Sequence, residues 1–207
     1  MKYLLFSTFI FVVTIVISQS FNSNKISKEQ KAETLNDVNT ISYEVLASKN
    51  GYQIRKYPEL TVATTELSSR SYSNNSNAGF RKIASYIFGG NSSNQQIAMT
   101  SPVQIDMGIE PTMSFFMPGN SDPSELPSPN RKDVIVTVQP SKIVAVIEFS
   151  GWASDRKLIN QFNLLKSKLG KDAIEFEDTY SFLGYNSPFE LFHRKNEVII
   201  SLKNYNN

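Results

Sequence analysis

The strongest constraint in this sequence is an order of elements that occurs twice. Runs of alternating apolar and polar residues, typical of half-buried strands, lie on either side of a segment with helical apolar spacing. Two such halves can bury both helices on one continuous antiparallel sheet. The order therefore predicts an α+β fold, with a curled or barrel-like sheet and two helices. The predicted strands cover residues 42–47, 52–57, 60–67, 96–105 and 112–117 in the first half, and 133–138, 143–149, 180–185 and 197–202 in the second.

Each predicted helix has a capping residue and one apolar face. We predict helices over residues 78–89, capped by Asn77, and 155–169, capped by Ser154, because short polar side chains accept hydrogen bonds from the first free N–H groups of a helix. The serine- and asparagine-rich segment 68–77 is predicted to be a loop. The residues expected to face inward are Phe80, Ile83, Ala84, Ile87 and Phe88 in the first helix, and Leu158, Ile159, Phe162, Leu165 and Leu169 in the second.

The N-terminal residues are typical of a secretory signal. Lys2 precedes an apolar stretch over residues 3–17, and Ser18 and Ser20 then provide a small-x-small cleavage site. A membrane-spanning helix needs about 20 apolar residues, so we expect a signal peptide that is cleaved after Ser20; an uncleaved N-terminal anchor is the alternative. The chain is then exported, to the periplasm or the medium, and touches a membrane only if this segment is retained. The expected division is signal peptide 1–20, polar spacer 21–41 and folded domain 42–203.

Composition excludes several classes of site. The chain of 207 residues has 21 Lys and Arg against 19 Asp and Glu, a balance that does not suit a protein that follows a nucleic-acid backbone. It has no cysteine, and His193 is its single histidine, which excludes disulfides, thiolate metal sites, cysteine nucleophiles and multi-histidine metal centres. No nucleophile elbow, phosphate loop or dinucleotide motif occurs. A small-molecule binder, a scaffold, or an enzyme that uses carboxylates, Lys, Ser or Tyr remains.

Three segments carry motifs that are specific in combination. They are residues 43–57 (YEVLASKNGYQIRKY), 79–103 (GFRKIASYIFGGNSSNQQIAMTSPV) and 184–198 (GYNSPFELFHRKNEV). Their order and spacing resemble the SOUL haem-binding family over about residues 42–203. The resemblance implies a distorted β-barrel of two pseudo-repeats flanked by two helices, which agrees with the element order. It also implies that the chain binds haem or a related tetrapyrrole, with a small planar molecule as its partner.

The resemblance also implies positions for a haem site. Some members have a His in the first motif, where this chain has Lys56. Other members hold haem on the first helix with a Lys, and with a second Lys after the Gly-Tyr-x-x-Pro loop; Ser85 and Glu190 occupy these places here. Both cations are lost, and Glu190 would repel a propionate, so we expect weak haem binding. Arg81 or Lys82 could compensate. The implied cofactor-binding residues are Phe80, Arg81, Lys82, Ala84, Ser85, Tyr185 and Phe189.

Two classes of function stay open. The first is an exported, non-catalytic binding protein for haem or another planar apolar molecule, with no catalytic or metal-ligating residue and with His193 exposed and unliganded. The second is a hydrolase-like enzyme or an effector-binding module on the same barrel. A buried carboxylate pair would favour hydrolysis, and Glu44, Glu66 and Glu148 are the candidates on strands. Tyr86 and Tyr185 could present hydroxyls to a ligand, although aromatic packing is expected. We expect Met99, Met107, Met113 and Met117 to fill the core.

Overall fold

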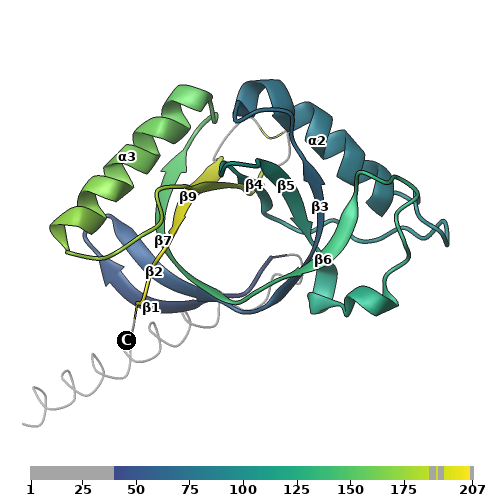
Figure 1. The fold of residues 1–207 in the computed structure, drawn as a ribbon, viewed down its shortest axis with the longest axis horizontal. Coiled ribbons are helices and arrows are strands. Elements are labelled where there is room, and N and C mark those ends of the chain that lie inside the picture. The colour runs from purple at the N-terminus through teal and green to yellow at the C-terminus, as the bar shows by residue number, and fades with distance from the viewer. Residues whose placement is uncertain (1–39, 187–189, 191–193, 206–207) are drawn as a thin grey trace, which may run out of the picture. The chain divides into compact units, whose positions relative to one another are not determined.

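The computed structural model describes residues 40–186, 190 and 194–205. Within them, nine strands form one antiparallel sheet in the order β1-β2-β7-β9-β8-β4-β5-β3-β6, and the sheet curls around its inner face while helices α2 and α3 cover its outer face (Figure 1). The predicted α+β class is confirmed. The predicted signal peptide and most of the predicted spacer fall outside the described residues. The strands are β1 Glu44–Lys49, β2 Tyr52–Tyr57, β3 Leu60–Glu66, β4 Val103–Asp106, β5 Thr112–Phe116, β6 Ile135–Gln139, β7 Lys142–Ser150, β8 Ser181–Gly184 and β9 Lys195–Ser201; the helices are α2 Tyr72–Ile87 and α3 Asp155–Lys171.

Helix α2 is longer than predicted. It begins at Tyr72, and its cap is Ser71, whose hydroxyl accepts a hydrogen bond from the N–H of Asn74 at 3.3 Å. The buried Asn75 amide donates to the carbonyls of Ser69 and Ser71 at 2.7 and 2.9 Å. The predicted loop therefore holds only over residues 68–71, and the predicted cap at Asn77 is wrong, because local side-chain hydrogen bonds hold the polar segment from residue 72 in a helix. Helix α3 begins after its predicted cap, Ser154.

Two residues expected to face inward are instead exposed. Phe88 is 63% exposed because it caps the end of α2, where the helical period no longer applies. Ile159 is 50% exposed, since it follows the fully buried Leu158 and adjacent helical residues point about 100° apart. The core between helices and sheet includes Ile83, Ile87, Leu158, Leu165 and Leu169 with residues of the outer sheet face such as Ile54, Met113, Phe115, Val198 and Ile200; Phe80 and Phe162 are half-buried at its edge.

Strand β4 is shorter than predicted. It starts at Val103 and not at residue 96. The residue before it is Pro102, and proline has no N–H to donate to a sheet ladder. Other strands lie within a few residues of the predicted ranges, and the Asn50-Gly51 turn between β1 and β2 forms as expected, with Gly51 at a φ of 82°. The predicted alternation thus locates the strands better than it locates their ends.

A second, smaller core fills the inner face of the curled sheet. Its buried members are Tyr57, Leu60, Val62, Phe116, Val144, Val146, Leu183 and Ile199. Because successive strand residues point to opposite faces, the sheet is apolar on both sides. Each face can therefore hold a site of its own.

The two helices begin next to each other, at one end of the sheet (Figure 1). Asp155, the first residue of α3, accepts hydrogen bonds from the backbone N–H groups of Tyr72 and Ser73 at 2.6 and 3.2 Å. One carboxylate thus caps α2 from the start of α3. Partial burial opposes ionisation, but these hydrogen bonds outweigh it and lower the pKa of Asp155. None of the helices in the described part of the chain combines the length and hydrophobicity that a membrane-spanning helix needs.

Candidate functional site

The family resemblance implies several cofactor-binding residues on α2, and their side chains face in two directions. Ala84 is 8% exposed, and the ring of Phe80 lies 5.1 Å from that of Phe115 in the outer sheet face. These two side chains belong to the core. Arg81 and Ser85 are exposed on the other side of the helix. The structure therefore brings these residues onto one helix but not onto one surface.

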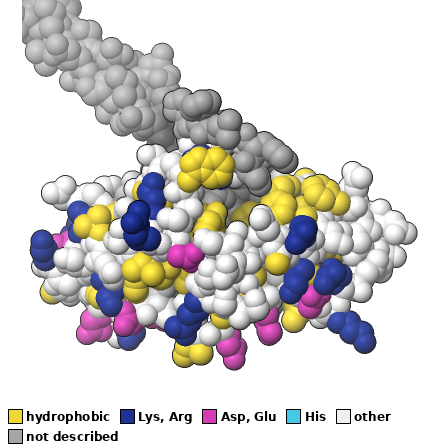
Figure 2. Space-filling view, turned by 90° about the horizontal axis from the view of Figure 1, so that it is seen from above, with side chains coloured by type: hydrophobic (Ala, Val, Ile, Leu, Met, Phe, Trp, Pro, Cys, Tyr) yellow, Lys and Arg dark blue, Asp and Glu magenta, His cyan; other side chains and the backbone are white. Residues whose placement is uncertain are grey.

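Arg81 and Ser85 are exposed one turn apart on α2, and the exposed Phe88 caps the end of the helix; we call these three residues the α2 stripe. Residues three and four apart are neighbours on a helix surface. Lys82 lies beside this stripe, but its ammonium is 3.3 Å from the carboxylate of Asp133, so its charge already has a partner. Figure 2 looks onto the helix side and shows charged and hydrophobic side chains interspersed. The stripe offers a planar ligand one aromatic side chain and one cation.

Tyr185 lies on the inner face of the sheet, away from α2. Its hydroxyl donates to Glu197 Oε2 at 2.8 Å, and Glu197 Oε1 forms an ion pair with Arg55 Nη1 at 3.0 Å. Glu197 is fully buried, and the ammonium of Lys195 is 3.4 Å from the same oxygen. The sheet thus separates Tyr185 from the α2 residues with which the resemblance grouped it.

The surroundings of Glu197 hold its partners in fixed protonation states. Burial opposes the charge of Arg55, but Glu197 together with the nearby hydroxyls of Tyr57 and Tyr43 outweighs this effect and raises the pKa of the guanidinium. Burial, and then Glu197, raises the pKa of Tyr185. The guanidinium also lies 4.1 Å from the ring centre of Tyr43. These residues form a structural ion pair, because neither Arg55 nor Tyr185 can exchange a proton near neutral pH.

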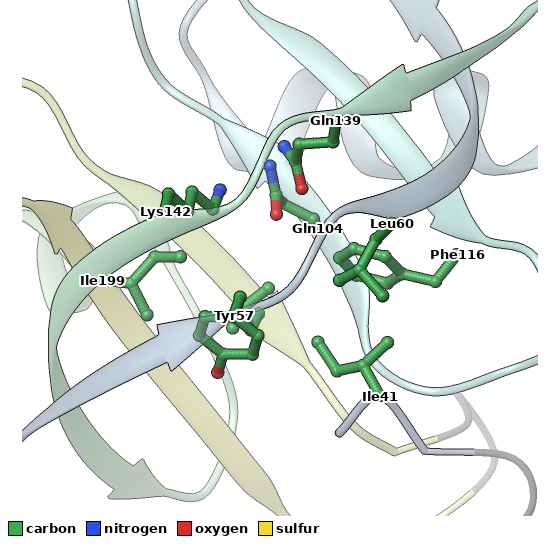
Figure 3. A pocket seen from close by; sticks show the side chains of 9 residues that line it. Ile41, Tyr57, Leu60, Gln104, Phe116, Gln139, Lys142 and Ile199 are labelled. Carbon is green, nitrogen blue, oxygen red and sulfur yellow. The ribbon is translucent and has the colours of Figure 1, made fainter. Parts of the chain in front are cut away.

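A small pocket lies on the inner face where the two halves of the sheet meet (Figure 3). The ammonium group of Lys142 and the amides of Gln104 and Gln139 gather at one end, and Leu60 and Phe116 lie at the other. Burial lowers the pKa of Lys142, although nearby carboxylates oppose this. We call this space the seam pocket. Side chains fill this pocket closely, and its lining residues are Ile41, Tyr57, Leu60, Gln104, Phe116, Gln139, Lys142, Leu183 and Ile199.

Glu190 lies near the start of α2, and Ser85 lies near its end. The guanidinium of Arg194 donates to the carbonyl oxygen of Glu190 at 2.7 Å, and its charge partly offsets the rise that burial causes in the pKa of Tyr72. Ser85 follows Tyr72 along the helix by about 20 Å, at about 1.5 Å per residue. The two positions that replace the family's lysines are therefore far apart along α2.

The other candidates have structural surroundings. The buried Tyr86 donates its hydroxyl to the carbonyl of Pro127 at 2.9 Å. Met99 is 39% exposed and so does not fill the core as expected, whereas the other three methionines are buried: Met107, Met113 and Met117. Phe189 and His193 lie outside the described residues. Across the described residues, no group of three or more His, Cys, Asp or Glu side chains is arranged to hold a metal ion.

Comparison with known proteins identifies the family. A family model described as SOUL heme-binding protein matches residues 38–201. The chain belongs to the SOUL family. Its relatives include Heme-binding protein 2 of Homo sapiens, 34% identical over 164 residues that cover 74% of this chain and 78% of the human protein. Heme-binding protein 1 of Xenopus laevis is 25% identical over 154 residues, covering 71% and 81% of the two chains. The predicted resemblance is confirmed.

Solved structures share the fold of this SOUL protein at much lower identity. The EcmrR C-terminal domain has a TM-score of 0.57 and 9% identity, covering 78% of this chain and 98% of that domain. A hydrolase from Listeria innocua has a TM-score of 0.54 and 6% identity, covering 76% and 94%. At such identities the likeness concerns the fold alone.

Sequence reasoning did not find the polar residues of the inner face. Alternation places Arg55 and Tyr57 on the same side of β2, and Glu197 in phase with Ile199 on β9. That signal was available in the sequence. The alternation is typical of a strand face exposed to solvent, however, because these residues are buried only by the curl of the sheet.

Proposed function

We propose that this chain is a non-catalytic binding protein for haem or a related tetrapyrrole, and that it binds haem weakly on the α2 stripe. The observation that carries the proposal is membership of the SOUL family together with relatives that are named heme-binding proteins. The geometry of α2 supports the location, since an exposed cation on this helix and an exposed aromatic ring at its end lie about two turns apart.

The residues of α2 fit a peripheral haem in part. The exposed ring of Phe88 provides an apolar surface, and Arg81, which has no ion pair with any described residue, can bind a propionate. Ser85 adds no charge where other members have a Lys. The stripe is exposed and is not a deep apolar slot, so we expect an affinity in the micromolar range or weaker, about −8 kcal/mol at best.

Haem supplies redox or gas-binding chemistry only through its own iron, and the chain's role here is to hold it. Arg81 would orient the propionates and Phe88 would shield one side of the ring from water. Tyr185 is engaged by Glu197 on the other face of the sheet, so we exclude it from this site.

The test is a haemin titration of the full chain, followed by Soret absorbance. Arg81→Gln should weaken binding about three- to tenfold, the effect of one partly screened charge, and the loss should shrink in high salt. Arg156→Gln is the matched control, because Arg156 is an exposed arginine on α3. Equal affinities for wild type and Arg81→Gln would place haem elsewhere, and failure to titrate any Soret band would refute haem binding.

The hydrolytic alternative depends on a buried carboxylate pair. Glu44, Glu66 and Glu148 are all exposed, and the buried Glu197 is paired with Arg55. A carboxylate that is already neutralised cannot serve as a general base without losing that partner. This arrangement supports binding in preference to hydrolysis.

We also propose that the chain is exported and loses residues 1–20. The apolar stretch over residues 3–17 and the small residues Ser18 and Ser20 support this. Intact-mass measurement of the exported protein should give a chain that starts at Phe21. A mass that includes Met1 would favour an N-terminal anchor.

A further inference from the structure

Asp133 lies between two cations beside the α2 stripe. Its carboxylate forms a bidentate ion pair with Arg131, whose Nε and Nη2 atoms are each 2.9 Å from a carboxylate oxygen. The ammonium of Lys82 is 3.3 Å from the same carboxylate. One acidic group is thus shared by two basic groups, and we call Lys82, Arg131 and Asp133 the charge cluster.

The fold fixes the place of this cluster. The hydroxyl of Thr65 on β3 donates to the backbone carbonyl of Asp133 at 2.6 Å, and the next residue, Val134, is buried in the outer core. The ammonium of Lys82 also donates to the carbonyl of Glu66, the last residue of β3, at 3.5 Å. The charge cluster is therefore held between α2 and the end of β3, with its three charged side chains partly exposed to solvent.

The charge cluster adjoins the α2 stripe through Lys82. This residue follows Arg81 directly and lies three residues before Ser85, and residues three apart are neighbours on a helix surface. Ser85 occupies the place where the family resemblance implies a lysine in other members. A cation one turn from that place is thus present in this chain, but Asp133 already holds it.

The charge of Asp133 acts against an anionic ligand in two ways. Hydrogen bonds from Arg131 and, to a smaller extent, from Lys82 outweigh desolvation and lower the pKa of Asp133 to about 2, so this carboxylate is ionised at neutral pH. It repels a propionate that approaches the stripe. It also competes with that propionate for the ammonium of Lys82 and the guanidinium of Arg131.

We propose that Asp133 determines the specificity of the α2 stripe against ligands with several carboxylates, because it withholds Lys82 and Arg131 from them. This inference rests on the proposed haem binding and concerns which tetrapyrroles bind. Arg81, which has no ion pair with any described residue, is available to one carboxylate. The stripe therefore suits a tetrapyrrole that presents one carboxylate to the protein, and further carboxylates gain nothing from the charge cluster.

The test is the variant Asp133→Asn, titrated with haemin in the full chain and followed by Soret absorbance. Asparagine keeps the side-chain volume and an acceptor for Arg131, and Asp133 is exposed, so the variant should fold. Haemin should bind at least about fivefold more tightly, since two cations become available to its propionates, and high salt should reduce this gain. Haemin dimethyl ester has no free carboxylate and should gain less than about twofold.

Two further variants locate the effect. Asp178→Asn is the matched control, because Asp178 is an exposed partner of Lys166 on the other helix and its loss changes the net charge equally. It should leave the haemin affinity within about twofold of wild type. Adding Lys82→Gln to Asp133→Asn should remove most of the gain, because the double variant lacks the cation one turn from Ser85.

The outcomes separate this inference from the proposed haem binding. If wild type binds haemin and Arg81→Gln weakens it, but Asp133→Asn binds no more tightly, the role of Asp133 is refuted and the haem site stands. An equal gain for the dimethyl ester, or for Asp178→Asn, would also overturn the role of Asp133, because the gain would not come from ligand carboxylates at this place. The absence of any Soret band would refute haem binding itself and this inference with it.

Discussion

Replacing Arg55 with methionine is expected to lower the free energy of unfolding by about 3–5 kcal/mol, the usual cost of removing one partner from a buried ion pair. The side chains of Arg55 and Glu197 are 5% and 0% exposed, and their nearest charged atoms are 3.0 Å apart. Methionine fills most of the arginine's volume but leaves the carboxylate without its guanidinium. The hydroxyl of Tyr185 and the ammonium of Lys195 remain near Glu197, so we expect the lower half of that range.

Urea unfolding followed by circular dichroism measures this loss. Arg131→Met is the matched control, because Arg131 and Asp133 form a bidentate ion pair that is exposed to solvent. The control should unfold close to the wild-type midpoint, since solvent and salt screen exposed pairs. If the Arg55→Met chain also unfolded at that midpoint, the argument from buried charge would be refuted.

A second substitution separates the charge effect from a packing effect. Adding Glu197→Gln to the Arg55→Met chain removes the unpaired charge and still leaves an acceptor for the Tyr185 hydroxyl. The double variant should recover at least about half of the lost free energy, a coupling that residues in contact show. Strictly additive losses would mean that the Arg55 side chain stabilises the fold by packing alone, for instance against the ring of Tyr43, 4.1 Å away.

Three further predictions test the fold and the haem proposal. Leu165→Ala should lower the free energy of unfolding by about 2–5 kcal/mol and Phe162→Ala by less, because Leu165 is fully buried and Phe162 is half-buried against Tyr180. A reversed order of the two losses in urea unfolding would contradict the assigned helix face. Asp155→Ala should lower the free energy of unfolding by about 1 kcal/mol at neutral pH. The difference should disappear in acid, because folding lowers the pKa of Asp155. The stability that this gives is present above the unfolded pKa of about 3.9 and is lost as the pH falls through the folded pKa. His193→Ala should leave the Soret band and the haemin affinity unchanged, and loss of the band would assign His193 as an iron ligand.

The outer layer of the fold could be predicted because its residues follow simple periods. Strand β2 matches its predicted range, and Ile83, Ile87 and Leu165 are buried as their spacing requires. The start of α2 could not be predicted, because the stretch before residue 78 is polar and low in apolar periodicity. Its helical state depends on hydrogen bonds that the Asn75 amide donates and on those that the carboxylate of Asp155, distant in the chain, accepts.

The inner face could not be predicted because its burial is a property of the whole sheet. Arg55 and Glu197 have the alternation of solvent-facing residues, and they are buried only because β2 and β9 both adjoin β7 in a sheet that curls. The same limit applies to the seam pocket. Lys142 and Gln104 come from distant parts of the chain, and no local motif connects them. The resemblance to SOUL proteins located the family, but it grouped Tyr185 with residues on the other side of the sheet.

The position of the sheet between the α2 stripe and the seam pocket leads to a last prediction, that changes in the two regions are energetically independent. Arg81 stands on the outer side of α2, and Lys142 lies on the inner face, with the outer core and the sheet between them. Changes at separated residues without shared partners usually add, and coupling between sites requires a ligand to favour one of two arrangements of the protein. Lys142→Met should therefore change the haemin affinity by less than about twofold in the Soret titration. A larger effect would show that a change on the inner face alters the arrangement of α2 through the curled sheet, and the α2 stripe and the seam pocket would then act as one coupled system.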